Sequence, residues 1–238
     1  MLGSTFSIAG PNIVLNTVVA DVLQEFADSL ENSADFNKEL ASLIQKTIHE
    51  HKRIIFNGNN YAKEWVHEAE KRGLSNLKTT VEALPAFIAP KSVAVFTRHN
   101  VFTETEIHSR YGILLENYCK TLHIEALTMI DMVKKEIIPA CISYQNDLMQ
   151  LCSAKKTYGS FDTTLEEHFL DKISKLVACM LNKLENLEAA LLETKNDSYT
   201  LDQALLYRDK VFAGMSQLRI VVDELETIIG KKYWPLPT

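Results

Sequence analysis

The sequence predicts an all-α protein, organised as an antiparallel bundle of three long helices that follows shorter N-terminal helices and an irregular connector. Three observations support this fold class. Apolar residues recur at three- and four-residue spacing through most of the second half of the chain, a residue that can cap a helix precedes each of those stretches, and only 8 glycines occur among 238 residues.

Two helices are expected near the start, at residues 11–30 and 33–51. Pro11 stands at the expected first helical position, where its missing amide costs no hydrogen bond. Ser33 is the expected cap of the second helix. Residues 1–9 show neither a helix nor a strand pattern.

The connector begins with a break in the helical rhythm at residues 53–60, where a short β-like apolar run precedes an Asn-Gly turn. A third helix is expected from Tyr61 to Lys71, with Gly73 as its terminating cap. Prolines limit residues 74–100 to short helices, one from Thr80 and another over 91–99.

The three- and four-residue spacing of apolar residues over 103–151 predicts one very long helix, in which Thr103 and Glu106 form a capping box. Pro139 is expected to kink this helix without ending it. The predicted buried stripe consists of Ile107, Tyr111, Leu114, Tyr118, Leu122, Ala126, Met129, Val133, Ile137, Ala140, Tyr144, Leu148 and Leu151.

Two later helices are expected to cover that stripe, because a single amphipathic helix of such length is not stable in water. They start with predicted capping boxes, Thr163 with Glu166 and Thr200 with Gln203. Short polar connections make sequential helices antiparallel neighbours. Their predicted buried stripes consist of Leu165, Phe169, Ile173, Leu176, Met180, Leu184, Leu187 and Leu191, and of Leu201, Leu205, Val211, Met215, Leu218, Val222, Leu225 and Ile229.

Composition excludes several classes of function. An apolar content of 46% is ample for a core, and a net charge of −6 without a basic cluster argues against nucleic acid as a partner. We find no apolar run long enough to span a membrane and no signal peptide, so a cytoplasmic location is expected. The 4 cysteines include no close pair and are read as reduced thiols.

No candidate catalytic or metal site emerges from the residues. The 7 histidines include no pair at the i, i+4 spacing of a zinc helix, so we expect them to make surface or interhelical hydrogen bonds. Glycine-rich phosphate loops and a serine nucleophile elbow are absent from the sequence. Acidic residues such as Glu166, Glu167 and Glu188 are expected on a solvated face, next to lysines of the same helix.

One segment has an unusual composition for a linker, and it is the predicted interface: Phe56, Asn57, Gly58, Asn59 and Tyr61. Its asparagines can simply bond to neighbouring backbone. The alternative is a loop that presents Phe56 and Tyr61 to a partner, because an isolated β-like run has backbone groups that need partners.

Several blocks along nearly the whole chain resemble the C-terminal region of type III glutamine synthetase. The blocks are Ser7–Thr17, Arg53–Asn59, Glu64-Trp65, Leu77–Thr80, Ala83–Pro85, Val101–Glu106, Arg110-Tyr111, Glu116–Tyr118, Ile124–Ala126 and Tyr233–Pro235, with Gly3-Ser4 ahead of them. The sequence departs from the family at Thr5-Phe6.

The resemblance implies part of an ATP- and magnesium-dependent ligase that joins ammonium to glutamate in a large cytoplasmic homo-oligomer. The family's metal, phosphate and glutamate ligands precede the segment that matches Gly3-Ser4, so no catalytic, cofactor or metal residue transfers to this chain, which is expected to be truncated at both ends. Residues 1–10 would end the catalytic domain, 11–102 would form the N-terminal helices and connector, 103–232 the bundle and 233–238 an extension.

Two functions remain open. The chain can be the helical C-terminal portion of a glutamine synthetase, which serves assembly with the rest of the subunit and with neighbouring subunits. Alternatively, it is a free-standing helical protein-interaction module without enzymatic activity.

Overall fold

The structure is a computed structural model that describes residues 7–194 and 199–237. Every regular element in these two ranges is helical, which confirms the all-α class. The chain divides into two compact units, Met1–Tyr111 and Gly112–Thr238, and the division falls within helix α6 (Glu104–Met132).

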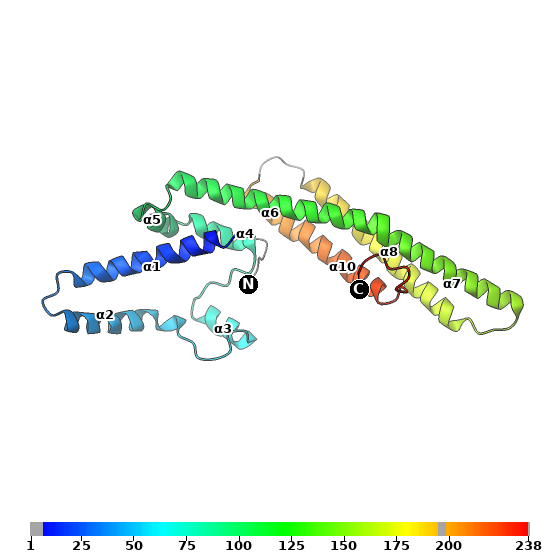
Figure 1. The fold of residues 1–238 in the computed structure, drawn as a ribbon, viewed down its shortest axis with the longest axis horizontal. Coiled ribbons are helices and arrows are strands. Elements are labelled where there is room, and N and C mark those ends of the chain that lie inside the picture. Colours follow the sequence, from blue (N-terminus) through cyan, green and yellow to red (C-terminus); the bar gives the residue numbers. More distant parts are fainter. Residues whose placement is uncertain (1–6, 195–198, 238) are drawn as a thin grey trace. The chain divides into compact units, whose positions relative to one another are not determined.

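Helices of moderate length and short turns form the first unit (Figure 1). Helix α1 packs against α2 and α5. The elements are α1 (Ala9–Leu30), α2 (Phe36–His51), the 3₁₀ turn η1 (Lys52–Ile54), α3 (Lys63–Lys71), α4 (Thr80–Ala83), the 3₁₀ turn η2 (Leu84–Ile88), α5 (Pro90–Arg98) and the start of α6.

Both predicted starts of the first two helices are wrong in detail. Helix α1 begins at Ala9, so Pro11 lies within the first turn, where its missing amide still costs no helical bond. Helix α2 is capped by Asp35, whose carboxylate accepts a hydrogen bond from the Lys38 amide at 3.2 Å. The Ser33 hydroxyl, the predicted cap, is buried without a hydrogen-bond partner in the part of the chain that is described.

The β-like run predicted at residues 53–60 is also wrong. Residues 52–54 form η1, and no strand occurs within 7–194 or 199–237. The next helix, α3, starts two residues after the expected Tyr61. Its predicted end is confirmed, because Gly73 has a φ of 73° and the amide of Leu74 donates to the Ala69 carbonyl oxygen at 2.9 Å.

The first unit has a thin core. Its buried apolar side chains, among the residues described, are Val81, Phe96 and Ile107. The ring of Phe96 lies between those of Phe87 and Phe102, with centroid distances of 5.6 and 5.5 Å. A core of this size leaves much of the unit's apolar surface uncovered.

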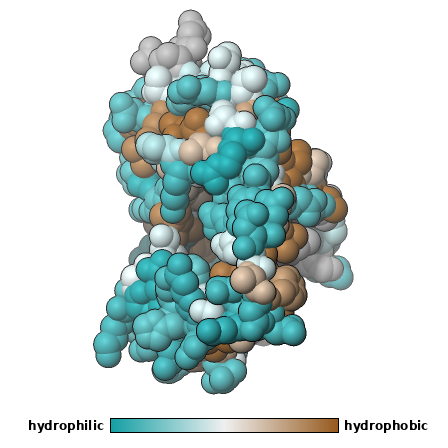
Figure 2. All heavy atoms as spheres, turned by 90° about the vertical axis from the view of Figure 1, so that its left-hand side faces the viewer, coloured by the Kyte–Doolittle hydropathy of each residue, from teal (hydrophilic) through white to brown (hydrophobic). Residues whose placement is uncertain are grey.

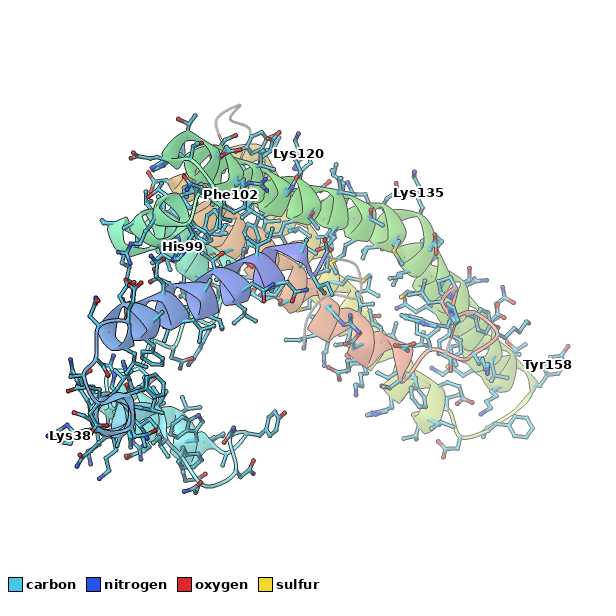
Figure 3. The ribbon with its side chains drawn as sticks, turned by 60° about the vertical axis from the view of Figure 1, so that its left-hand side comes forward. Lys38, His99, Phe102, Lys120, Lys135 and Tyr158 are labelled. Atoms are coloured by element: carbon cyan, nitrogen blue, oxygen red, sulfur yellow. The ribbon has the colours of Figure 1, made fainter. Side chains whose placement is uncertain are left out.

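A polar contact joins α1 to the end of α5. His99 Nε2 lies 2.8 Å from Asp21 Oδ1, and Arg98 Nη1 donates to the same oxygen at 2.9 Å. Figure 3 shows His99 beside α1. The hydrogen bond from His99 is the main cause that lowers the pKa of Asp21. This histidine makes an interhelical bond, as predicted.

The second unit is an antiparallel arrangement of long helices. Figure 1 shows α8 returning beside α7, and α10 running back beside α8, in agreement with the packing of α8 against both. The elements are the rest of α6, the π turn η3 (Val133–Ile137), α7 (Ile138–Tyr158), α8 (Thr164–Glu193), α9 (Leu201–Leu206), the π turn η4 (Tyr207–Phe212) and α10 (Ala213–Glu226).

The predicted features of the longest helix are largely confirmed. The Thr103 amide donates to the Glu106 carboxylate at 2.7 Å, and the Glu106 amide donates to Thr103 Oγ1 at 3.3 Å, which completes the capping box. The helix continues past Pro139, and the irregularity expected there takes the form of the π turn η3. The second π turn, η4, was not predicted.

The predicted stripes are correct in their centres and wrong at some positions near their ends. On α6, Leu115 and Cys119 are buried, whereas the predicted Leu114 is exposed. On α7, Cys152 is buried, whereas the predicted Leu151 is exposed. In each case two adjacent residues are apolar or nearly so. The three- and four-residue spacing therefore admits both rows, and only the packed partner decides between them.

The start of α8 differs most from the prediction. Leu165 is 64% exposed, whereas Glu166 is 6% exposed and pairs with Lys155 Nζ at 2.5 Å. Thr163 makes no side-chain cap, and the carboxylate of Asp162 accepts from the Thr164 amide at 2.9 Å instead. Glu166 is used to join the end of α7 to the start of α8, so it neither closes a capping box nor faces solvent.

The capping box predicted for the third long helix is half correct. The amide of Gln203 donates to Thr200 Oγ1 at 3.3 Å. The side chain of Gln203, however, donates to the carbonyl oxygen of Thr194 at 2.5 Å instead of returning to the cap. A buried glutamine thus holds the end of α8 against the start of α9.

Acidic residues of α8 pair mostly with other helices, contrary to the expectation of partners on the same helix. Lys134, in the π turn η3 that precedes α7, bonds to Glu188 at 2.5 Å, and Glu193 pairs with Lys210 of η4. These pairs tie neighbouring helices of the unit together at its surface.

Candidate functional site

The predicted interface segment, Phe56 to Tyr61, folds back on helix α3. The ring of Phe56 stacks on that of Trp65 with a centroid distance of 4.1 Å and an interplanar angle of 24°. Arg72 lies over the same indole, 5.6 Å from its centroid. Phe56 is therefore half-buried, and the prediction that it is an exposed anchor is wrong.

Arg72 satisfies backbone groups at the start of this segment. Its Nη1 donates to the carbonyl oxygens of Ile55 at 2.9 Å and Arg53 at 3.3 Å. Its Nε donates to Glu68 at 2.7 Å, which is the main cause of the lowered pKa of Glu68. The backbone therefore finds a partner within the unit, so unsatisfied groups are no argument for an interface here.

Gly58 and Asn59 shape the turn itself. A Cβ atom at Gly58 would lie 2.6 Å from Phe56 Cζ, so the stacked ring leaves no room for a side chain there. The Asn59 side chain accepts a hydrogen bond from the Tyr61 amide at 3.0 Å, which is the local role expected of asparagine. Asn57 is exposed.

Tyr61 is the residue that this turn presents to solvent, with an exposed fraction of 98%. Ile54 and Ile55, just before the turn, are also exposed. The geometry thus places three apolar or aromatic side chains on the surface near the turn. An interface role for the segment stays a prediction.

Sequence reasoning missed a larger apolar surface, on helix α1. Figure 2 shows several apolar patches on a largely hydrophilic surface. The exposed apolar residues of this helix are Val14, Leu15, Val18, Val19, Val22 and Leu23. The signal was present in the sequence, because these residues form two adjacent apolar rows on one side of the helix, whereas the row that the structure covers contains Ile13, Thr17 and Asp21.

The structure provides no metal site in its described ranges, where no group of three or more His, Cys, Asp or Glu side chains is arranged to hold an ion. His123, like His99, makes a hydrogen bond between helices, because its Nδ1 lies 3.2 Å from Tyr207 Oη. None of the helices described has the length and apolar character needed to cross a membrane.

Comparison with known proteins identifies the family. Residues 39–156 match the family model "Glutamine synthetase C-terminal domain". The chain is 39% identical over 205 residues to a glutamine synthetase of Butyrivibrio fibrisolvens, with 86% of the chain covered. It is 31% identical over 251 residues to the type-3 glutamine synthetase of Dictyostelium discoideum, with 99% of the chain covered.

These relatives are much longer than this chain, which spans 29% of the first and 33% of the second. A glutamine synthetase of Bacteroides fragilis is 28% identical over 244 residues, and the chain spans 34% of its length. The matches agree with the blocks of sequence that resemble the type III enzymes. The chain belongs to the glutamine synthetase family and corresponds to the C-terminal region of its type III members.

Proposed function

We propose that this chain is the helical C-terminal portion of a type III glutamine synthetase, and that it serves assembly and structural support. The whole enzyme would join ammonium to glutamate with ATP and magnesium, while this portion contributes no catalytic residue. The observation that carries the proposal is the match to the C-terminal domain of enzymes about three times as long as the chain.

The structure of the first unit supports a role in assembly. Its core of Val81, Phe96 and Ile107 is small, while α1 keeps a continuous exposed apolar face. Exposed apolar patches of this kind mark surfaces that bind other proteins or other parts of the same protein. The partners that we propose are the remainder of the synthetase subunit and neighbouring subunits in a homo-oligomer.

The first test is enzymatic. Phosphoryl transfer needs positioned metal ions and cationic groups, and the described residues offer no acidic or histidine cluster to hold such ions. We expect the purified chain to form no γ-glutamyl hydroxamate from glutamate, ATP and hydroxylamine at any Mg²⁺ concentration. Hydroxamate formation above that of a heat-treated sample would show that the chain does contain catalytic residues.

The second test concerns the interface segment in the full-length enzyme. Replacing Tyr61 by Ala should leave the thermal unfolding of the isolated chain unchanged, because an almost fully exposed residue buries little surface on folding. The same change should shift the assembled enzyme towards smaller species in sedimentation. Phe56→Ala is the contrasting variant, because it removes the stack on Trp65 and should destabilise the chain by roughly 1 kcal/mol or more.

The alternative function, a free-standing interaction module, makes a different prediction. The genomic sequence upstream of the codon for Met1 would then contain no in-frame catalytic domain. Tyr61→Ala would also weaken the binding of a partner protein in a strain that has no synthetase. An in-frame catalytic domain supports the assembly role.

A further inference from the structure

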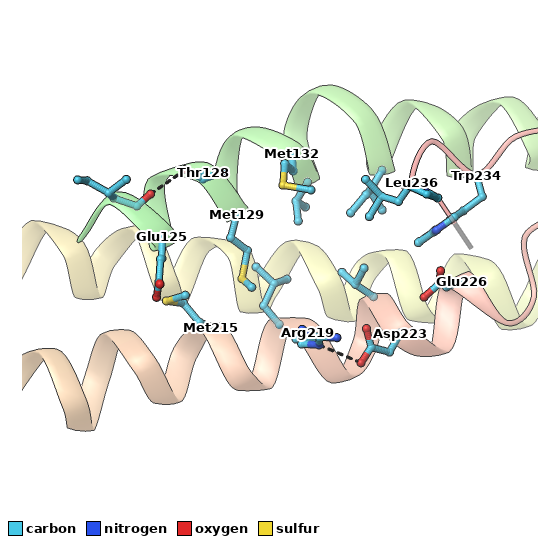
Figure 4. Close-up of a pocket in the computed structure, with 16 residues that line it drawn as sticks. Glu125, Thr128, Met129, Met132, Met215, Arg219, Asp223, Glu226, Trp234 and Leu236 are labelled. Atoms are coloured by element: carbon cyan, nitrogen blue, oxygen red, sulfur yellow. Dashed lines mark hydrogen bonds and ion pairs between the residues drawn. The ribbon is translucent and has the colours of Figure 1, made fainter. Parts of the chain in front are cut away.

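A cavity in the second unit has the properties of a ligand site. It has a volume of about 540 Å³, within the range of about 300 to 1,000 Å³ that is typical of pockets for small molecules. Helices α6 and α10 form its two sides, and the C-terminal segment with Trp234, Leu236 and Pro237 closes one end (Figure 4).

The inner surface of the cavity is apolar and adaptable. Val133, Ile137, Leu218 and Val222 are buried residues of its lining. Three of the 6 methionines of the chain, at positions 129, 132 and 215, also line it. Methionine side chains have several rotatable bonds and a polarisable sulfur, so such a wall can adjust to the shape of an apolar ligand.

One polar group in the lining lacks a partner. Trp234 is only 7% exposed, yet its Nε1 finds no hydrogen-bond acceptor among the described residues. Figure 4 shows the indole reaching from the C-terminal segment towards α10, with its nitrogen on the side of Glu226. A buried N–H without a partner costs free energy, so a ligand whose acceptor oxygen reaches Nε1 after a small rotation of the indole would gain from it.

The charges on the lining favour a cation. Arg219 and Asp223 form an ion pair with each other at 3.3 Å and largely cancel. Glu125 is exposed and Glu226 is half-buried, and neither forms an ion pair with any described residue, so two uncompensated carboxylates lie at the edge of the apolar wall. Opposite charge on a ligand is attracted most strongly where the surroundings are apolar.

The wall also contains an irregularity of the helix. Val133 and Ile137, which line the cavity, are the two ends of the π turn η3. Single π turns inside long helices occur frequently at functional sites, because they displace side chains from regular helical positions. The turn, the cavity and the unpartnered indole are independent observations at one place.

We propose that this cavity binds a small amphiphilic organic cation: a molecule with an apolar body, an acceptor oxygen for the Trp234 N–H and a positive group for Glu125 and Glu226. The inference goes beyond the proposed function and does not depend on it. It would give this region of the chain a ligand in addition to its role in assembly.

The probe for this proposal is octanoylcholine, which combines an eight-carbon chain, an ester carbonyl and a quaternary ammonium group. We expect the full chain to bind it at millimolar or lower concentration in calorimetry, and to bind octanoate and choline at least tenfold more weakly. In ¹⁵N NMR the indole N–H signal of Trp234 should move on titration, while that of Trp65 stays in place; Trp65→Phe assigns the two signals.

Two variants test the separate contacts. Trp234→Phe keeps a ring but removes the donor, and it should weaken binding about 3- to 10-fold, as expected for the loss of one hydrogen bond. Glu226→Gln removes one charge from a half-buried position, so it should fold normally, and it should reduce the preference for octanoylcholine over octanoate. Glu224→Gln, on the same helix but outside the cavity, is the control; it breaks an exposed ion pair with Lys172, which contributes little to stability, and it should leave the binding of the probe unchanged.

Several outcomes would overturn the proposal. One is that octanoylcholine causes no calorimetric signal and no shift of the Trp234 indole. Others are that octanoate binds as well as the cation, that Glu226→Gln and Glu224→Gln behave alike, or that Trp234→Phe binds the probe with unchanged affinity.

Discussion

At the scale of single residues, the most informative finding is that Glu166 is buried in place of Leu165. Glu166 is buried against Lys155 while its apolar neighbour faces solvent. The periodicity of apolar residues could not predict this, because it assigns every buried position of a helix to an apolar side chain. A charged residue can occupy such a position only when a specific partner is present, and that partner is eleven residues away in the sequence.

The Lys155–Glu166 pair makes stability depend on pH. The hydrogen bond from Lys155 is the main cause that lowers the pKa of Glu166 below its ordinary value. A group whose pKa is lowered on folding stabilises the protein fully above its unfolded pKa, about 4.3 for Glu, and this contribution is lost as the pH falls through the folded value.

We therefore expect Lys155→Met to lower the melting temperature at pH 7, and the difference from the unmodified chain to shrink as the pH falls below about 4.3. Lys156→Met is the matched control, because its partner Glu167 is exposed and exposed pairs contribute little. Thermal unfolding followed by circular dichroism from pH 3 to 7 measures both. Equal effects of the two variants at pH 7 would show that the burial of Glu166 adds nothing to the stability that its ion pair provides.

At the scale of elements, caps and periodicity predicted much of the second unit. The centres of the stripes, the Thr103–Glu106 box and the passage of the helix through Pro139 are confirmed. What could not be predicted depends on partners distant in sequence. The side chain of Gln203 leaves its capping box to bond to the end of the preceding helix, and at the start of α8 the carboxylate of Asp162, in place of the Thr163 hydroxyl, accepts a hydrogen bond from a helix amide.

The local structure of residues 56–61 was predicted less well for a similar reason. The composition of residues 56–61 identified an unusual loop but not its internal packing. The stack of Phe56 on Trp65 and the bonds from Arg72 involve residues of α3 or just beyond it, and no local pattern specifies them. The exposed position of Tyr61 was predicted correctly.

The stripe of α8 gives a sharp test at this scale. Met180 is fully buried, whereas its neighbour Leu181 is exposed. Met180→Asp should destabilise the chain by roughly 3 to 5 kcal/mol, because it leaves an uncompensated charge in the core, and Leu181→Asp should cost little. Urea unfolding measures both. Leu218→Asp, at another fully buried position on α10, should behave like Met180→Asp.

At the scale of the whole molecule, the two units differ in how much apolar surface they bury. Three apolar side chains are buried in the described part of Met1–Tyr111, while long buried stripes run through α6, α8 and α10 in Gly112–Thr238. Stability rises with the area removed from water, so the first unit should be the less stable of the two.

This difference predicts that the chain does not unfold in one step. Each unit contains one of the 2 tryptophans, Trp65 in the first and Trp234 in the second, so two single-tryptophan variants can report on the units separately. Trp234→Phe leaves Trp65 as the reporter, and its fluorescence should change at lower urea concentration than that of Trp234 in the Trp65→Phe variant.

Circular dichroism provides the control, because it follows the helices of both units. If the replacements themselves do not alter stability, both variants should show the same dichroism curve as the unmodified chain, broader than either fluorescence transition. Coincident fluorescence transitions would mean that the units unfold together, and the thin core of the first would then be stabilised through the helix α6 that both units share. Separate transitions would show that the first unit is the less stable one, and covering its exposed face on α1 would then add to its stability, in agreement with the proposed role in assembly.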